Sequence, residues 1–251
     1  MDNAIYVSLS RQMVLQRRLE ITANNIANID TAGFKIEHLD VHTDPLTPKG
    51  GGRQGPLNYV SDTGVVRSFT QGAVEKTGNP YDLAISGAGF FSVQTAGGAG
   101  VAYTRDGHFG LDAQGQIVDK EGNPVLSTGG SPIVVDPTRP APTIGKDGVV
   151  SQIGPNAQVA QLGRIGIMSF PNLGALTKVG SSLYTADGET PTAATDSMVV
   201  QGGLEKSNVQ GVTEIANLIS IQRAYERMQD IITATQTISG KAIDSLGKLS
   251  S

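Results

Sequence analysis

The chain has 251 residues, of which 23 are acidic and 19 basic, and its formal charge of −4 gives no electrostatic footprint for nucleic acid or anionic lipid. It contains no cysteine, so disulfides, thiolate metal sites and cysteine nucleophiles are excluded. Its 32 glycines, 12 prolines and 5% aromatic residues are typical of short strands and many turns. We therefore expect one or two domains, a β-rich middle and no nucleic-acid partner.

Residues 1–30 predict an N-terminal helix. Apolar residues recur along it at spacings of four and three, which predicts a packing seam on one face. The predicted seam consists of Ile5, Leu9, Gln12, Gln16, Leu19, Ala23 and Ile26. Charged residues interrupt MDNAIYVSLSRQMVLQRRLE, so we expect no cleaved signal peptide.

The helix is expected to end within ANNIANIDTAGFK. Asparagine tolerates the left-handed conformation and its amide can donate to the last helical carbonyls, so Asn28 and Gly33 are expected to stop the helix and turn the chain. Asn24 and Asn25 are expected to bond to neighbouring backbone, within the chain or across a subunit contact; alternatively, Asn24 is merely a residue type common near helix ends. We assign packing or capping roles to Asn24, Asn25, Ile26, Asn28, Gly33 and Phe34.

Residues 31–72 contain three prolines between positions 45 and 56 together with a Gly50-Gly51-Gly52 run, which predicts an extended connector. Residues 73–200 show short alternating apolar pairs separated by turn dipeptides such as Asp106-Gly107 and Asp147-Gly148, which predicts an antiparallel β-rich domain. The uncharged run from Leu83 to Thr104 contains several glycines, so we interpret it as strands and turns and expect no membrane insertion.

Residues 201–251 predict a C-terminal coiled-coil helix. Its apolar residues alternate spacings of three and four, a period of about 3.5 residues. The seam residues to which we assign packing roles are Leu218, Ile221, Tyr225, Met228, Ile232 and Leu246. Ser207 and Gln210 match a capping box before this helix, and Arg223 and Glu226 are surface neighbours one turn apart.

The predicted fold class is α+β, in which long N- and C-terminal α-helices form a coiled-coil core and an antiparallel β-rich domain is inserted between them. A pair of helices leaves one side of each apolar stripe exposed to water. Full burial therefore requires neighbouring molecules, and the sequence favours a polymer.

No catalytic constellation is evident. His38, His42 and His108 do not follow a metal-ligand spacing, and the aspartates at 106, 112 and 119 lack the calcium-loop pattern, so we interpret the latter as turn residues. We expect no catalytic residue, no metal and no cofactor, and we expect that the protein is not an enzyme.

Three blocks of sequence closely resemble the bacterial flagellar rod and hook proteins. They are ANNIANIDTAGFK; TQGAVEKTGNPYDLAISGAGFFSV with YTRDGHFGLDAQGQIV; and GGLEKSNVQGVTEIANLISIQRAYERMQDIITATQTI, and they follow one another in the family order. The opening residues and the length most resemble the proximal rod members, with the distal rod members as the alternative.

The resemblance implies a structural subunit of the flagellar basal-body rod that polymerises helically to form part of the torque-transmitting drive shaft. It implies contacts with copies of itself and with other axial rod proteins, export by the flagellar type III apparatus, a location in the rod that spans the periplasm, and possible polar contacts between subunits at Arg223 and Glu226. A rival hypothesis of another class is a secreted oligomeric binding module.

Overall fold

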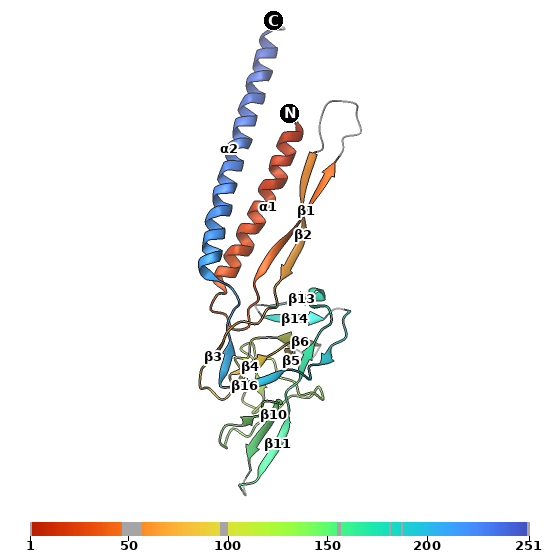
Figure 1. Cartoon of the computed structure of the whole chain (residues 1–251), viewed down its shortest axis with the longest axis vertical. Helices are drawn as coiled ribbons and strands as arrows, with labels where there is room; N and C mark the ends of the chain where they lie inside the picture. The colour runs from red at the N-terminus through yellow and green to blue at the C-terminus, as the bar shows by residue number, and fades with distance from the viewer. Residues whose placement is uncertain are drawn as a thin grey trace. The chain divides into compact units, whose positions relative to one another are not determined.

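The computed structural model describes residues 2–46, 57–95, 100–154, 157–180, 182–186 and 188–249, except for the side chains of residues 2–6, 43–46, 57–61, 239 and 242–249. The chain divides into two compact units (Figure 1). The helical unit comprises Met1–Ala27, Glu37–Arg67 and Gln210–Ser251, and the β unit comprises Asn28–Ile36 and Ser68–Val209.

The helical unit contains α1 (Asp2–Ala27), α2 (Gly211–Leu249) and a hairpin of β1 (Glu37–Leu46) and β2 (Leu57–Arg67). The helices are antiparallel, because Gln12 near the start of α1 donates to the Tyr225 hydroxyl at 3.1 Å while Asn25 near its end donates to Glu214 at 3.2 Å (Figure 1). None of the described helices is both long and apolar enough to cross a membrane.

The β1–β2 hairpin corrects the expectation of an extended connector over residues 31–72. The ten residues of β1 pair in antiparallel register with β2, from Glu37 opposite Arg67 to Leu46 opposite Leu57. The prolines and glycines that suggested a connector lie between positions 45 and 56 of the sequence, and residues 47–56 are outside the described part of the chain. A short sequence stretch rich in proline and glycine is compatible with strand pairing between the segments on either side of it.

The predicted seam on the N-terminal helix has the wrong phase. The buried positions of α1 are Val14, Leu15, Ile21, Thr22 and Asn25. Of the predicted seam, Leu9 is 47% exposed, Ala23 is exposed and Ile26 is half-buried, while the Ile5 side chain lies outside the described residues. The reason is that α1 packs against both α2 and the β1–β2 hairpin, and these two contacts together determine which face of α1 is buried.

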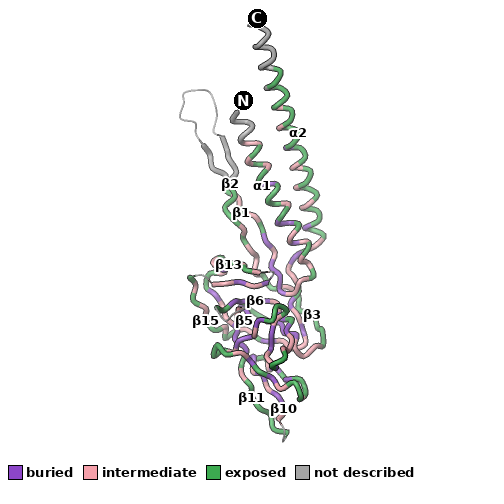
Figure 2. Tube along the Cα trace, turned by 180° about the vertical axis from the view of Figure 1, so that it is seen from behind, coloured by how far each residue is buried: buried purple, intermediate pink, exposed green. Residues whose placement is uncertain are grey.

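The predicted seam of α2 is the side of that helix that turns inward within the helical unit. Leu218, Ile221, Tyr225 and Ile232 are half-buried and Met228 is 9% exposed, as the burial pattern in Figure 2 illustrates. Leu246 lies in α2, but its side chain is outside the described residues.

The β unit is an assembly of short antiparallel strands, as the alternating apolar pairs predicted. Its largest sheet has six strands in the order β13-β14-β6-β5-β12-β15, and a second has the order β11-β10-β9, while β16-β4, β17-β3 and β7-β8 are pairs. The strands are β3 (Val74–Lys76), β4 (Leu83–Ser86), β5 (Phe90–Gln94), β6 (Val101–Thr104), β7 (Gly110–Leu111), β8 (Ile117–Val118), β9 (Thr143–Ile144), β10 (Val149–Ile153), β11 (Val159–Arg164), β12 (Ile167–Ser169), β13 (Leu176–Lys178), β14 (Leu183–Ala186), β15 (Thr192–Ala193), β16 (Met198–Gln201) and β17 (Gly203–Glu205), with a short 3₁₀ helix at Leu173–Ala175.

Two hydrophobic clusters stabilise the β unit, one on each side of β5. Successive residues of a strand point to opposite faces of its sheet. Phe91 accordingly joins an aliphatic cluster with Phe109, and its ring lies 5.1 Å from that of Phe109, whereas Phe90 joins an aromatic cluster in which Tyr103 and Phe170 lie 4.8 Å apart.

The aspartates of the β unit form turns, as predicted. The Asp112 side chain accepts hydrogen bonds from the amides of Gln114 at 2.9 Å and Gln116 at 2.7 Å. Asp119 does the same for Glu121 at 2.9 Å and Asn123 at 2.8 Å. These bonds are those of an aspartate that stabilises its own turn.

The predicted start of the C-terminal helix needs a correction. Within residues 201–210, β17 pairs with β3, and α2 begins only at Gly211. Ser207 accepts from the Val209 amide at 3.2 Å instead of capping a helix with Gln210. Pairing of β17 with β3 holds this stretch extended, which overrides the local capping pattern.

The chain turns at Gly33, as predicted, but not through a left-handed Asn28. The turn after α1 is closed by a hydrogen bond from the Thr31 amide to the Asn28 carbonyl at 3.2 Å, and the non-glycine residue with a positive φ in the described chain is Ala157. Gly33 has a φ of 68°, and its amide donates to the Glu205 carbonyl at 2.8 Å. A Cβ on Gly33 would lie only 2.3 Å from the Arg105 carbonyl carbon.

We therefore predict that Gly33→Ala destabilises the β unit much more than Gly78→Ala. Gly78 has a φ of 78° with open space around it, so both variants incur the cost of a positive φ, about 1 kcal/mol, and only Gly33→Ala adds a backbone collision. Urea unfolding of the full chain measures the difference, and equal loss of unfolding free energy in the two variants would contradict the close approach at Gly33.

Candidate functional site

Three charged side chains from distant parts of the sequence meet inside the β unit. Lys35 follows the turn at Gly33, Arg105 follows β6 and Glu205 ends β17; we call them the buried ion cluster. The Glu205 carboxylate accepts from Lys35 Nζ at 2.6 Å and from Arg105 Nη1 at 3.0 Å. The side chains of Lys35 and Glu205 are fully buried and that of Arg105 is 5% exposed.

Backbone groups add further hydrogen bonds to the buried ion cluster, although the buried Arg105 Nε has no hydrogen-bond partner among the described residues. Lys35 also donates to the Thr70 carbonyl at 2.8 Å, and Arg105 to the Gly87 carbonyl at 2.9 Å. The Gly72 amide donates to Glu205 at 3.0 Å. The cluster thus ties the segment before β3, the ends of β4 and β6, and β17 to one carboxylate.

The cluster contains two cations and one anion, and this balance of charge affects the pKa of Lys35. Burial lowers the pKa of the Lys35 ammonium below its usual value, and the nearby Arg105 lowers it further, while Glu205 acts in the opposite direction. Removal of the single carboxylate would leave two buried cations without a counter-charge, which is strongly destabilising.

Beside this cluster, the uncharged side chain of Asn208 joins two chain segments by hydrogen bonds. Its side-chain oxygen accepts from the Ile36 amide at 2.8 Å, and its side-chain amide donates to the carbonyls of Ser68 at 2.9 Å and Thr70 at 3.0 Å. One asparagine thereby joins the segment that follows Gly33 to the segment that precedes β3.

The helical unit has its own polar junction, centred on Asn25. Its side chain donates to the Glu37 carbonyl at 2.8 Å and accepts from the Glu37 amide at 3.0 Å, which imitates one step of strand pairing between α1 and β1. The same amide group donates to the carboxylate of Glu214 at 3.2 Å. Asn24 donates to the Glu37 carboxylate at 3.3 Å, and Arg67 donates to the same carboxylate at 2.9 Å.

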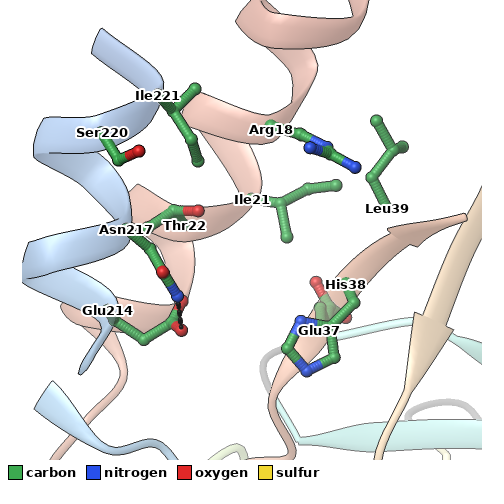
Figure 3. A pocket seen from close by; sticks show the side chains of 10 residues that line it. All are labelled: Arg18, Ile21, Thr22, Glu37, His38, Leu39, Glu214, Asn217, Ser220 and Ile221. Carbon is green, nitrogen blue, oxygen red and sulfur yellow. Dashed lines mark hydrogen bonds between the residues drawn. The ribbon is translucent and has the colours of Figure 1, made fainter. Parts of the chain in front are cut away.

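A pocket of about 380 Å³ opens above this junction, between α1, α2 and β1 (Figure 3). Ile21 and Ile221 line it where the two helices lie beside each other, and Glu37 and Glu214 lie at its other end. Glu214 is bonded to Asn217 at 3.0 Å, so both carboxylates of the pocket already have hydrogen-bond partners. The carboxylates that line the pocket are therefore already partnered, whereas Arg18, which also lines it, has no ion pair among the described residues.

The residues that the sequence analysis assigned to the end of the N-terminal helix thus lie in two different units. Asn24 and Asn25 lie in the helical unit, whereas Asn28, Gly33 and Phe34 lie in the β unit, where Phe34 is 1% exposed beneath the Lys178 ammonium. Arg223 and Glu226 are both exposed on α2, and Glu226 accepts from Gln222 at 3.4 Å.

A second face of α2 is apolar and exposed. Val212, Ile215 and Ile219 follow the helical spacing of three and four and are 87%, 50% and 46% exposed. At 100° per residue they lie opposite Ile221 and Met228. We call these three residues the outer face of α2.

Comparisons with known proteins agree with this organisation. Residues 5–35 match the family described as flagella basal body rod protein, residues 84–152 the flagellar hook protein FlgE/F/G D1 domain, and residues 200–245 the flagellar basal body rod FlgEFG protein C-terminal family. The chain is 48% identical to the flagellar basal-body rod protein FlgF of Caulobacter vibrioides over 99% of this chain and 100% of that protein. The chain belongs to the flagellar basal-body rod protein family.

Other members of the rod protein family align along nearly the same length. The FlgF protein of Mesorhizobium japonicum is 36% identical over 100% of both chains. The FlgG protein of Bacillus subtilis is 32% identical over 95% of this chain and 97% of that protein.

Each matched segment contributes one residue to the buried ion cluster. Lys35 ends the first segment, Arg105 lies in the second and Glu205 lies in the third. Sequence analysis missed the cluster and Asn208. The available indication was the placement of Lys35 directly after Phe34 and of Arg105 two residues after Tyr103, in GFK and YTR.

We predict that Glu205→Gln lowers the free energy of unfolding by about 3–5 kcal/mol, because Lys35 and Arg105 would remain buried without an anion. Glu75→Gln is the matched control, since Glu75 pairs with Lys206 at 2.6 Å but both side chains are more than half exposed. Urea unfolding of the full chain compares the two. A loss for Glu205→Gln no larger than for the control would show that the cluster does not stabilise the unit.

Proposed function

We propose that the chain is a non-catalytic subunit that polymerises helically in the flagellar rod and transmits torque, and that the outer face of α2 is covered by neighbouring subunits. The observation that carries the proposal is the pair of opposite apolar faces on α2. α1 packs on the seam side of α2, and Val212, Ile215 and Ile219 remain exposed. Full burial of an aliphatic side chain contributes about 1.5–3 kcal/mol, so a neighbour that covers these residues gains several kcal/mol.

The length of α2 supports the same proposal. Because Gln12 bonds to Tyr225 and Asn25 to Glu214, the start of α1 lies opposite roughly Gln236. Beyond that point α2 continues to Leu249 without α1 beside it, as Figure 1 shows. We infer that this end of α2 packs among other axial subunits and that its seam, including Leu246, continues there as a coiled coil.

The remaining assigned residues acquire roles within this proposal. Leu218, Ile221, Tyr225, Met228 and Ile232 pack the helices together, and Asn24 and Asn25 fix where α1 meets β1. Arg223 and Glu226 project from α2 near the outer face and are proposed to form polar contacts between subunits. Closely packed helices transmit torque because a twist would force side chains out of their packed positions.

We place the subunit in the proximal rod, as its resemblance to FlgF implies, with other axial rod proteins as neighbours and the flagellar type III apparatus as its export route. The quoted FlgF relatives are 48% and 36% identical, against 32% for the quoted FlgG relative. Electron microscopy of basal bodies from a deletion strain would show whether the rod stops at its proximal part.

We predict that Ile219→Lys abolishes rod assembly without unfolding the chain. Ile219 is 46% exposed, so a lysine there is tolerated in the isolated subunit but must be desolvated when a neighbour covers the outer face. Gln229→Lys adds the same charge at an exposed polar position of α2 and serves as the control. Motility and the thermal melting of the purified chain are the readouts, and normal swimming with Ile219→Lys would contradict the proposal.

A further inference from the structure

We propose that an acidic pocket of the β unit receives an arginine or lysine side chain from a second copy of this chain. This inference rests on the proposed self-assembly and adds a specific contact to it. The acidic pocket has a volume of about 260 Å³. Its lining includes Asp106, Asp119, Lys120, Glu121 and Ser182.

The acidic pocket brings together separate parts of the β unit. Asp106 lies just after β6, Asp119 and Glu121 belong to the turn after β8, and Ser182 directly precedes β14. The turn after β8 is held rigidly, because Asp119 accepts from the amides of Glu121 and Asn123 at 2.9 and 2.8 Å. The pocket is therefore preformed by folded elements.

The carboxylates of the acidic pocket exceed its cations. Asp106 is paired with Lys120 at 3.2 Å, and Asp119 accepts hydrogen bonds from neutral amides. Glu121 has no ion pair within the described part of the chain, and its Oε1 lies 3.9 Å from the position that a Cβ on Gly180 would occupy. The negative charges of Asp119 and Glu121 are thus left without a counter-ion among the described residues.

Ser182 supplies an independent indication of a missing partner. The residue is 7% exposed, and among the described residues its Oγ has no hydrogen-bond partner. Buried hydroxyl groups in native structures are nearly always hydrogen-bonded. Ser182 is one of the residues that line the acidic pocket, and its hydroxyl is able to accept a hydrogen bond.

The chemistry of these groups selects a basic side chain as the occupant. Two uncompensated carboxylates and an unpaired hydroxyl oxygen are all acceptors, and guanidinium and ammonium groups carry only donors. Lys120 already shows the contact that such a group makes, with its ammonium on Asp106. The pocket volume accommodates the end of a side chain as well as a small ion.

Charge complementarity within the chain identifies the second copy as the source. Lys76 in β3 and Lys146 in the turn between β9 and β10 are exposed, and neither has an ion pair among the described residues. They lie on elements other than those that form the acidic pocket. A contact between different surfaces of successive copies is heterologous and propagates without closing, which suits a helical polymer.

The test measures how much of the chain is recovered in basal bodies from cells that make one full-length variant. We expect Glu121→Lys to lower recovery at least about tenfold, because reversal of one charge in a close pair puts like charges together. Glu121→Gln should lower recovery less. Glu189→Lys is the matched control, since it reverses an acidic residue of the same unit outside the pocket, and unchanged melting temperatures of the purified variants establish that each one folds.

Rescue identifies the partner. Recovery of Glu121→Lys on addition of Lys76→Glu or Lys146→Glu is the expected result. The inference is overturned if Glu121→Lys is recovered as well as Glu189→Lys, or if neither lysine reversal restores it. Ile219→Lys, included in the same series, separates the two proposals: its loss alongside full recovery of Glu121→Lys refutes the pocket contact and leaves the outer face of α2 standing.

Discussion

The constraint on which the account depends is that α2 is apolar on two opposite faces, and the chain supplies a cover for one of them. Residues of the predicted seam turn inward within the helical unit, where Met228 is 9% exposed and Tyr225 bonds to Gln12. Val212, Ile215 and Ile219 lie on the opposite side of α2 from this seam and remain exposed to solvent. Exposed apolar patches of this kind mark interaction sites. The outer face of α2 is therefore uncovered in the isolated subunit, and we propose that assembly covers it.

In the β unit, the buried ion cluster holds together chain segments that are distant in sequence. Lys35, Arg105 and Glu205 lie in the three segments that match the family, and one carboxylate holds both cations. Buried ion pairs contribute little net stability compared with apolar packing, but a broken pair is costly. The cluster therefore favours one arrangement of the segment after α1, β6 and β17 over alternatives. Asn208 reinforces this arrangement with neutral hydrogen bonds to Ile36 and Ser68.

The sequence predicted those features that arise from local periodicity and turn chemistry. The presence of α1 and α2, the inward seam of α2, the turns at Asp112 and Asp119 and the turn at Gly33 all follow from residues close together in the chain. The phase of α1 was wrong because its buried face depends on where α2 and the β1–β2 hairpin lie. The hairpin itself was missed because the prolines and glycines between positions 45 and 56 of the sequence outweighed the strand pattern on either side.

The site residues show the same division. The expectation that Asn25 bonds to backbone is confirmed, with Glu37 as the partner, but nothing local indicates that Glu37 or Glu214 is that partner. The buried ion cluster could not be predicted from the sequence either, because Lys35 and Glu205 are 170 residues apart. They become neighbours only through the pairing of β17 with β3 and the turn at Gly33. Sequence patterns identify buried apolar residues readily, whereas a buried charge is recognisable only when its counter-charge is known.

The most direct test uses the absence of native cysteine from this chain. A single cysteine introduced by Ile219→Cys is treated with a maleimide, both in the purified full-length subunit and in isolated basal bodies, with Met228→Cys as the buried reference. The account predicts rapid labelling at position 219 in the isolated subunit and strong protection in the basal body, whereas position 228 reacts slowly in both. Equally rapid labelling of position 219 in the two preparations would contradict the claim that neighbouring subunits cover the outer face of α2.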